Sequence, residues 1–194
     1  MKKNSKNTKG KIVTAAWKLF YEQGYDNTTV EEIIDESGTS KGSFYHYFEG
    51  KDGLLGSLSE IFDDKYTELM EEIEEPMNSF DLLLYLNREL FDMIETSVDP
   101  ELLTRLYSSQ LVTKGEKHLL NKRRVYYKIL KEIITSGQEK GELSTEFSVS
   151  EAVKLYAMCE RAIIYEWCLS GCAYSLKDYS VRMLPVLLNK LRIN

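Results

Sequence analysis

Apolar side chains recur at helical spacing along almost the whole chain, and no run alternates with the two-residue period of a strand. The first such stretch predicts a helix that ends at about Gln23, because Gly24 follows and glycine commonly ends helices. Five apolar residues form its stripe: Ile12, Ala15, Ala16, Leu19 and Phe20. The pattern therefore predicts an all-α chain.

Two short helices are expected next. Thr28 or Thr29 can cap the first, which should stop at Gly38, and Ser40 can cap the second, which should stop at Gly50. Two short helices joined by a glycine-containing turn are typical of a helix-turn-helix.

The rest of the pattern predicts further helices, about nine in total. A long fourth helix should run from about Lys51 to near Pro76, and Asp99 followed by Pro100 is a strong helix start. Ser148 and Glu151 predict a capping box before a helix that covers residues 151–170. The last helix should start at Ser175 and be kinked by Pro185. Apolar periodicity places two more helices over residues 80–94 and 116–136.

Composition limits the protein's class. A chain of 194 residues with 43% hydrophobic and 29% charged residues forms one or two soluble domains. No apolar run is long enough for a membrane span or a signal segment, so we expect a cytoplasmic protein. Three clustered cysteines, Cys159, Cys168 and Cys172, argue against a disulfide framework.

The charge is unevenly distributed along the chain. The net charge is −6, yet residues 1–18 contain six lysines and no acid. A basic N-terminal arm on an acidic body can orient a protein on a polyanion, although a basic patch alone is only an electrostatic footprint.

The third helix carries the chemistry that points to function. Phe44 and Phe48 lie one turn apart and define its buried side, so Gly42, Ser43 and His46 point away from the core. Tyr45 and Tyr47 flank this weakly charged face. Such a face can enter the major groove of DNA and read base edges. Lys41 and Lys51 could contact phosphates.

These residues resemble the TetR family of bacterial transcriptional regulators. The resemblance covers residues 9–58 and is most specific in SKGSFYHYFEGKDGLL, residues 40–55. It implies a homodimer, with a DNA-binding domain over residues 1–53 and a helical effector-binding and dimerisation domain over residues 54–194. It also implies DNA-contacting roles for Thr28, Thr29, Ser40, Lys41, Gly42, Ser43, Tyr45, His46, Tyr47 and Lys51. Ile34 and Ser37 depart from the alanines that the family usually has there.

The segment 151–170 is apolar on more than one side, so one side can face its own core and the other a symmetry mate. We expect a dimer interface formed by Val153, Ala157, Ile164, Trp167, Leu176, Met183, Leu187 and Leu191. A large single-chain core is the alternative interpretation of the same pattern.

Aromatic and soft side chains in the C-terminal part could line an effector pocket. The residues assigned to it are Tyr107, Tyr126, Tyr127, Met158, Arg161 and Tyr165. Arg161 could receive a ligand carboxylate or pair with a glutamate, and most of the aromatic residues could equally belong to the core.

Enzyme motifs are not found. The chain has two histidines, no phosphate loop and no nucleophile elbow, so we expect neither a cofactor nor a metal site. The sequence therefore predicts a TetR-like repressor that a small, largely apolar effector releases from a pseudo-palindromic DNA operator. The alternative is a helix-turn-helix regulator controlled by a protein partner, with no small-molecule pocket.

Overall fold

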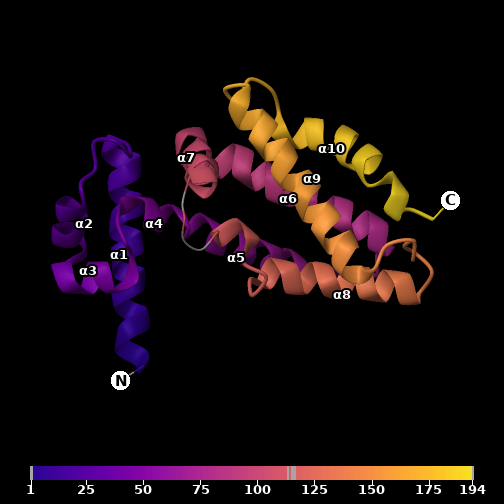
Figure 1. The fold of residues 1–194 in the computed structure, drawn as a ribbon, viewed down its shortest axis with the longest axis horizontal. Coiled ribbons are helices and arrows are strands. Elements are labelled where there is room, and N and C mark those ends of the chain that lie inside the picture. The colour runs from indigo at the N-terminus through magenta and orange to yellow at the C-terminus, as the bar shows by residue number, and fades with distance from the viewer. Residues whose placement is uncertain (1, 113, 115–116, 194) are drawn as a thin grey trace.

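A computed structural model describes residues 2–112, 114 and 117–193 and shows an all-α chain in this part, as the sequence predicts. Figure 1 shows an N-terminal unit of α1 to α3 at one end of the molecule and a larger helical body at the other, with α4 and α5 between them. The α-helices are α1 (Lys2–Gln23), α2 (Val30–Ser37), α3 (Lys41–Tyr47), α4 (Lys51–Leu55), α5 (Leu58–Glu71), α6 (Ser79–Ser97), α7 (Pro100–Val112), α8 (Val125–Glu139), α9 (Val149–Leu169) and α10 (Leu176–Leu187). Two 3-10 helices are η1 (His118–Leu120) and η2 (Asn189–Leu191).

The ends of the first three helices form as predicted. Gly24 and Gly38 follow α1 and α2 with φ of +84° and +60°, the left-handed conformation that glycine adopts without strain. Thr29 and Glu32 form a capping box at the start of α2, and the Ser40 hydroxyl accepts the Ser43 N–H at the start of α3. These caps hold the turn between the two short helices.

The predicted fourth helix is broken into α4 and α5 at Gly56 and Ser57. A Cβ at Gly56 would lie 2.7–2.9 Å from the imidazole atoms of His118, so the η1 segment packs directly on the break. The Ser57 hydroxyl accepts a hydrogen bond of 2.9 Å from Trp17 Nε1 of α1. Because both partners come from distant segments, helical periodicity alone gives no sign of this break.

The segment predicted as a helix from Glu116 starts later than expected. Glu116 lies outside the described residues, and α8 begins only at Val125, after η1. Asn121 ends η1, and its side-chain oxygen accepts the N–H of Arg123 at 2.9 Å. Asparagine favours such local turns over helix, which accounts for the difference.

The body is built around α6, whose buried Leu83, Leu86 and Phe91 lie among the other helices. It packs against α5, α8 and α10. Figure 1 shows α9 crossing α6 in the view, and α9 itself packs on α7, α8 and α10. Ser148 and Ser175 cap α9 and α10 as the sequence predicts, and Pro185 lies inside α10 near its end. No helix among the described residues combines the length and apolarity that a bilayer span needs.

Candidate DNA-binding surface and effector region

The outer face of α3 is open to solvent. Phe44 is fully buried and Phe48 almost so, with ring centroids 5.8 Å apart, which fixes the inner side of the helix. Figure 1 shows α3 at the outer end of the N-terminal unit. The exposed residues of this helix are Lys41, Gly42, Tyr45 and His46. Ser40 is also exposed, and Ser43 and Tyr47 are half-buried. The face that the sequence assigned to DNA is therefore not covered by the rest of the described chain.

Neither the packing nor the backbone conformation of α3 requires a glycine at position 42. The nearest atom to a Cβ at this position would be Ser40 Oγ at 4.0 Å, and Gly42 is absent from the residues with positive φ. Glycine in a helix costs about 1 kcal/mol relative to alanine. The α3 backbone at Gly42 is therefore exposed to solvent without a side chain to cover it.

Thr28 is not available to DNA through its side chain. It is 1% exposed, and its hydroxyl donates to the Gly24 carbonyl at 2.8 Å. This hydroxyl closes the loop between α1 and α2, so a phosphate contact at Thr28 would have to be made by its main chain. Thr29 is exposed, but its hydroxyl is engaged in the capping box with Glu32.

Lys51 also has a structural role that the sequence did not reveal. Its ammonium donates to the carbonyl oxygens of Tyr25 at 2.5 Å and Thr28 at 2.8 Å, and it lies 4.3 Å from the centroid of the Tyr25 ring. In the free chain these donors hold the α1–α2 loop, and the phosphate contact of Lys51 stays a prediction. Lys41, by contrast, forms only an exposed ion pair with Glu31 at 3.3 Å, which a phosphate can replace at little cost.

Tyr25 joins the N-terminal unit to the body. Arg105 of α7 lies 4.8 Å from the Tyr25 ring centroid and forms an ion pair with Asp26. Burial, and then the hydrogen bond to Asp52, raise the pKa of the Tyr25 hydroxyl. A second tie runs from the Tyr21 hydroxyl to the Ser97 carbonyl at 2.9 Å. These contacts tie α1 and the loop after it to α6 and α7.

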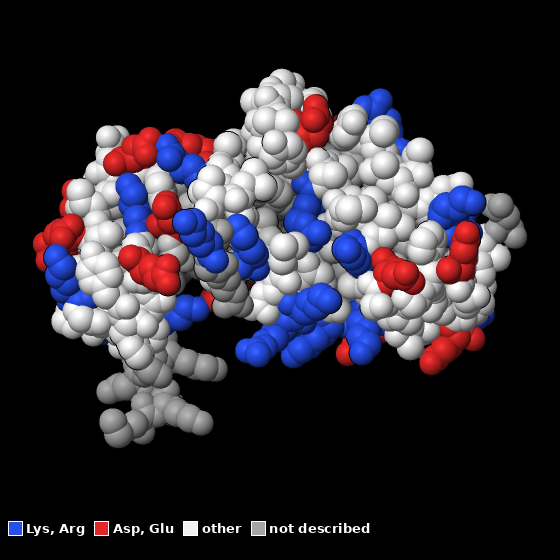
Figure 2. All heavy atoms as spheres, viewed as in Figure 1, with Lys and Arg blue, Asp and Glu red and all other residues white. Residues whose placement is uncertain are grey.

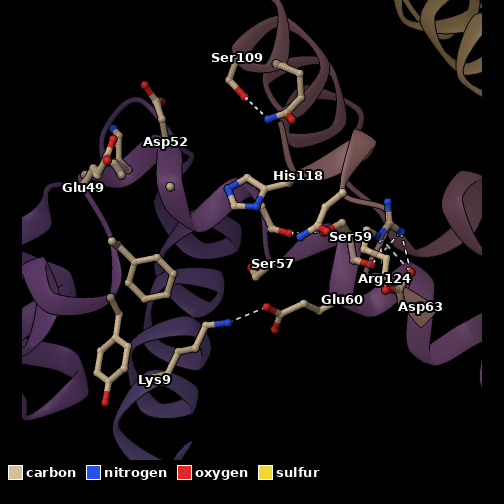
Figure 3. Close-up of a pocket in the computed structure, with 18 residues that line it drawn as sticks. Lys9, Glu49, Asp52, Ser57, Ser59, Glu60, Asp63, Ser109, His118 and Arg124 are labelled. Atoms are coloured by element: carbon tan, nitrogen blue, oxygen red, sulfur yellow. Dashed lines mark hydrogen bonds and ion pairs between the residues drawn. The ribbon is translucent and has the colours of Figure 1, made fainter. Parts of the chain in front are cut away.

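A cavity of about 670 Å³ separates the two parts beside the α4–α5 break. Figure 3 shows Lys9 of α1 reaching Glu60 of α5, with His118 between Ser109 and Ser57. The Lys9–Glu60 ion pair measures 2.6 Å, and Arg124 binds Asp63 at 2.7 Å. The Lys9–Glu60 pair joins α1 to α5 across the junction, whereas the Arg124–Asp63 pair joins α5 to the start of α8 within the body.

The residues assigned to an effector pocket do not converge on one cavity. Tyr107 and Tyr126 are buried in the core, and Arg161 Nη1 donates to the hydroxyl of Tyr127 at 3.2 Å. Met158 is 50% exposed and Tyr165 43% exposed. Their assignment to an enclosed pocket is wrong, because both lie on the outer side of α9.

A buried carboxylate that the sequence analysis passed over occupies the centre of the body. Glu160 of α9 is 4% exposed and accepts hydrogen bonds from Tyr66 at 2.9 Å, Asn87 at 2.9 Å and Tyr126 at 2.5 Å. Burial raises the pKa of Glu160 and, with the nearby carboxylate, those of Tyr66 and Tyr126. The available signal was an acid inside the apolar stripe of the 151–170 segment. We call these four residues the Glu160 cluster.

The predicted dimer interface is largely turned inward. Ala157, Ile164, Trp167, Leu176 and Leu191 are each at most 4% exposed within the single chain, so they cannot form a partner surface as predicted. They are buried because α9 packs on α7, α8 and α10. Val153 and Met183 are half-buried, and Leu187 is exposed. The exposed apolar stripe of α9 consists instead of Met158, Ala162, Tyr165 and Leu169.

A mostly apolar groove of about 360 Å³ runs between α6 and α10. Met77, Leu84, Tyr85, Val181 and Leu184 supply its apolar lining. Asn87, which also lines the groove, is the residue whose amide binds Glu160. The Asn87 side chain therefore links the groove to the buried Glu160 at the centre of the body.

Comparison with known proteins agrees with this architecture. Residues 12–58 match the family of bacterial regulatory proteins of the tetR type, and residues 60–190 match the C-terminal region of YsiA-like proteins. The fatty acid metabolism regulator protein of Bacillus subtilis is 25% identical over 92% of both chains. The transcriptional regulator QacR of Staphylococcus aureus is 27% identical over 81% of this chain and 82% of its own length.

A further relative matches only the N-terminal part. An uncharacterised regulator of Lactococcus lactis is 50% identical over 48 residues, which is 25% of this chain and 24% of that protein.

Two solved structures share the fold over nearly the full length. Thermus thermophilus FadR in complex with lauroyl-CoA has a TM-score of 0.76 at 20% identity and covers 95% of both chains. Bacillus subtilis FadR in complex with stearoyl-CoA has a TM-score of 0.69 at 22% identity, covering 94% of this chain and 98% of that one. The matches span both the α1–α3 unit and the body, and the chain belongs to the TetR family of bacterial transcriptional regulators.

Proposed function

We propose that this chain is a homodimeric repressor that leaves a pseudo-palindromic DNA operator when a small, largely apolar effector binds its body. The observation that carries the DNA-binding half is the solvent-open, weakly charged outer face of α3, with Gly42 at its start. Two such helices in a dimer would meet half-sites about 34–36 Å apart, or a multiple of that spacing.

An acyl-CoA thioester is the effector class that we propose. Two relatives of the same fold were solved with stearoyl-CoA and lauroyl-CoA, and the relative from Bacillus subtilis is named a fatty acid metabolism regulator. The groove between α6 and α10 supports this choice for the acyl chain of such a ligand, because its lining is mostly apolar. Arg88 also lines the groove, and an anionic group of such a ligand would compete there with Glu89, with which Arg88 pairs at 2.6 Å.

Release would follow from a population shift. An effector that separates α6 from α10 disturbs Asn87 and with it the Glu160 cluster, which joins α5, α6, α8 and α9. Because α5 continues through the break at Gly56 into α4, a new position of α5 changes the pose of α3. The effector acts only through its higher affinity for the pose that does not fit the operator.

The experiment combines selection with release. Duplexes that the protein selects from a random-sequence library should share an inverted repeat, and lauroyl-CoA or stearoyl-CoA should then release them. Leu84→Asp should abolish release and keep DNA binding, whereas the control Leu84→Met should behave as wild type. Selected duplexes without a common repeat contradict the repressor, and operator retention at saturating acyl-CoA contradicts the effector.

A protein partner remains the second proposal for the regulatory input. The close packing of Tyr107 and the Glu160 cluster in the centre of the body favours it, because this region holds buried, hydrogen-bonded side chains where a small-molecule cavity was expected. If every acyl-CoA and metabolite tested leaves the operator complex intact, while a co-purifying protein dissociates it, this second proposal replaces the first.

A further inference from the structure

The segment from Lys117 to Lys131 is basic in a protein that is acidic overall. It contains six lysines and arginines and no acid, whereas the whole chain carries a net charge of −6. Two of the six are engaged within the chain: Lys117 donates to the Gln110 carbonyl, and Arg124 pairs with Asp63. The other four are Lys122, Arg123, Lys128 and Lys131, which we call the basic face.

The basic face points to solvent. All four side chains are exposed, and in the part of the chain that the structure describes none of them forms an ion pair. The neighbouring helix α5 is acidic, but Asp63 is bound by Arg124, and Glu68 pairs with Lys65 of its own helix. Four like charges therefore stand together without compensation from these two carboxylates.

The place of this face in the molecule indicates its partner. Figure 2 shows lysines and arginines gathered along the lower edge of the body, below α5 and the start of α8. In the same view, Figure 1 places α3 and the first residues of α1 in the lower part of the N-terminal unit. A polyanion that lies along α3 and continues past this edge would approach the basic face. Double-stranded DNA is the polyanion that this family binds.

We propose that the basic face, which comprises Lys122 and Arg123 in the turn after η1 and Lys128 and Lys131 of α8, binds phosphates of the DNA backbone outside the base pairs that α3 contacts. The contact is independent of sequence, because flexible lysines and an exposed arginine meet phosphates as charges and carry no base information. It adds affinity and salt dependence to a complex whose specificity resides in α3. It also brings DNA to the turn that directly follows η1, the segment whose His118 packs on the α4–α5 break.

The test removes the four charges together. The variant Lys122→Gln/Arg123→Gln/Lys128→Gln/Lys131→Gln is compared with wild type and with the control Lys140→Gln/Lys190→Gln, whose lysines are exposed and lie at the end of α8 and in η2. Affinity for the selected operator, centred in a duplex of about 60 bp, roughly six helical turns, is measured over a range of salt concentrations. Far-UV circular dichroism checks that each variant is folded, and its mass in solution checks that it is dimeric. If the fourfold variant is unstable, the variants Lys122→Gln/Arg123→Gln and Lys128→Gln/Lys131→Gln are tested in its place.

The proposal predicts a smaller salt slope with unchanged specificity. Each lost phosphate contact lowers the slope of log K against log [salt] by about 0.9, so the fourfold variant should lose about 2 or more while the control keeps the wild-type slope. The ratio of operator to scrambled-duplex affinity should stay as in wild type. Substitutions on α3 should lower that ratio instead, which separates this proposal from the repressor proposal.

Two outcomes would overturn the proposal. One is a fourfold variant with wild-type affinity and salt slope. The other outcome combines two results: the fourfold variant keeps the wild-type salt slope for DNA, and it no longer binds phosphatidylglycerol vesicles that the wild type binds. The basic face would then serve an anionic membrane surface.

Discussion

At the scale of single residues, Glu160 is the least expected feature of the body. A carboxylate in the core is costly unless it is neutral or well paired, and Glu160 is held by uncharged hydroxyl and amide donors. Its raised pKa is a consequence of burial, which the donors only partly offset. The residue therefore destabilises the folded chain at neutral pH in return for joining four helices.

Glu160→Gln should remove a pH-dependent loss of stability. Below the pKa of an unfolded glutamate, about 4.3, Glu160 is protonated in both states and adds no pH dependence. As pH rises, the unfolded chain ionises first, so the free energy of unfolding falls until pH passes the raised pKa of the folded state. The difference between variant and wild type in urea unfolding, followed from pH 4.5 to 8, should thus grow in favour of the variant as pH rises and level off once pH passes the raised pKa. A constant difference over this range contradicts the assignment.

Gly42→Ala should separate folding from DNA binding. The new methyl group meets nothing closer than 4.0 Å in the free protein, so the free energy of unfolding should stay equal or rise by up to about 1 kcal/mol. DNA affinity should fall about tenfold, which corresponds to about 1.4 kcal/mol. Thermal unfolding and DNA titration measure the two effects. Wild-type DNA affinity in this variant would mean that no phosphate or base approaches the α3 backbone at Gly42.

Single-residue roles could be predicted from sequence only where local geometry decides them. Helical spacing correctly separated buried Phe44 from exposed Tyr45, because both belong to one short helix. The hydrogen-bond partners of Thr28 and Lys51 were missed. These bonds close the α1–α2 loop, and the periodicity of apolar residues predicts helices but not the conformation of a loop.

At the scale of elements, the break between α4 and α5 is the structural link from body to N-terminal unit. It exists because Gly56 lets the His118 ring approach and because Ser57 binds Trp17 of α1. A continuous helix would move as one rigid element. At the break, the angle between α4 and α5 also depends on the η1 segment that contacts it.

Gly56→Ala should lower the free energy of unfolding by about 1–3 kcal/mol, because its methyl group would overlap the His118 ring. The double variant Gly56→Ala/His118→Ala should recover most of that loss. Gly53→Ala is the matched control, since a Cβ there would meet Phe48 at an ordinary 3.6–3.7 Å. Chemical unfolding measures all three. Equal losses in Gly56→Ala and the double variant would show that His118 is not the obstacle.

Element types were largely predictable, and element faces were not. The 151–170 helix is apolar nearly all round, so its sequence could not decide which stripe meets the chain's own core. The structure turns Ile164 and Trp167 inward and leaves Met158 and Leu169 outside, which depends on where α7, α8 and α10 pack.

At the scale of the whole molecule, the exposed stripe of α9 predicts where two copies meet. Leu169 is 65% exposed beside Tyr165 and Met158 on the same side of the helix. Leu169→Asp should raise the dimer dissociation constant at least tenfold, equivalent to about 1.4 kcal/mol, and weaken operator binding in parallel. Leu111→Asp, at a 70% exposed leucine of α7, is the control and should leave the dimer intact. Sedimentation equilibrium measures the change, and an unaltered dimer in Leu169→Asp places the interface elsewhere.

The whole account depends on α3 reading DNA with its outer face. The most direct measurement is the ratio of affinities for the selected operator and a scrambled duplex, in wild type and in Tyr45→Ala/His46→Ala, with dimer mass checked for both. We predict that the variant stays dimeric and loses at least tenfold of this ratio, about 1.4 kcal/mol of discrimination, while its binding to scrambled DNA changes little. A folded, dimeric variant with the wild-type ratio would contradict the account.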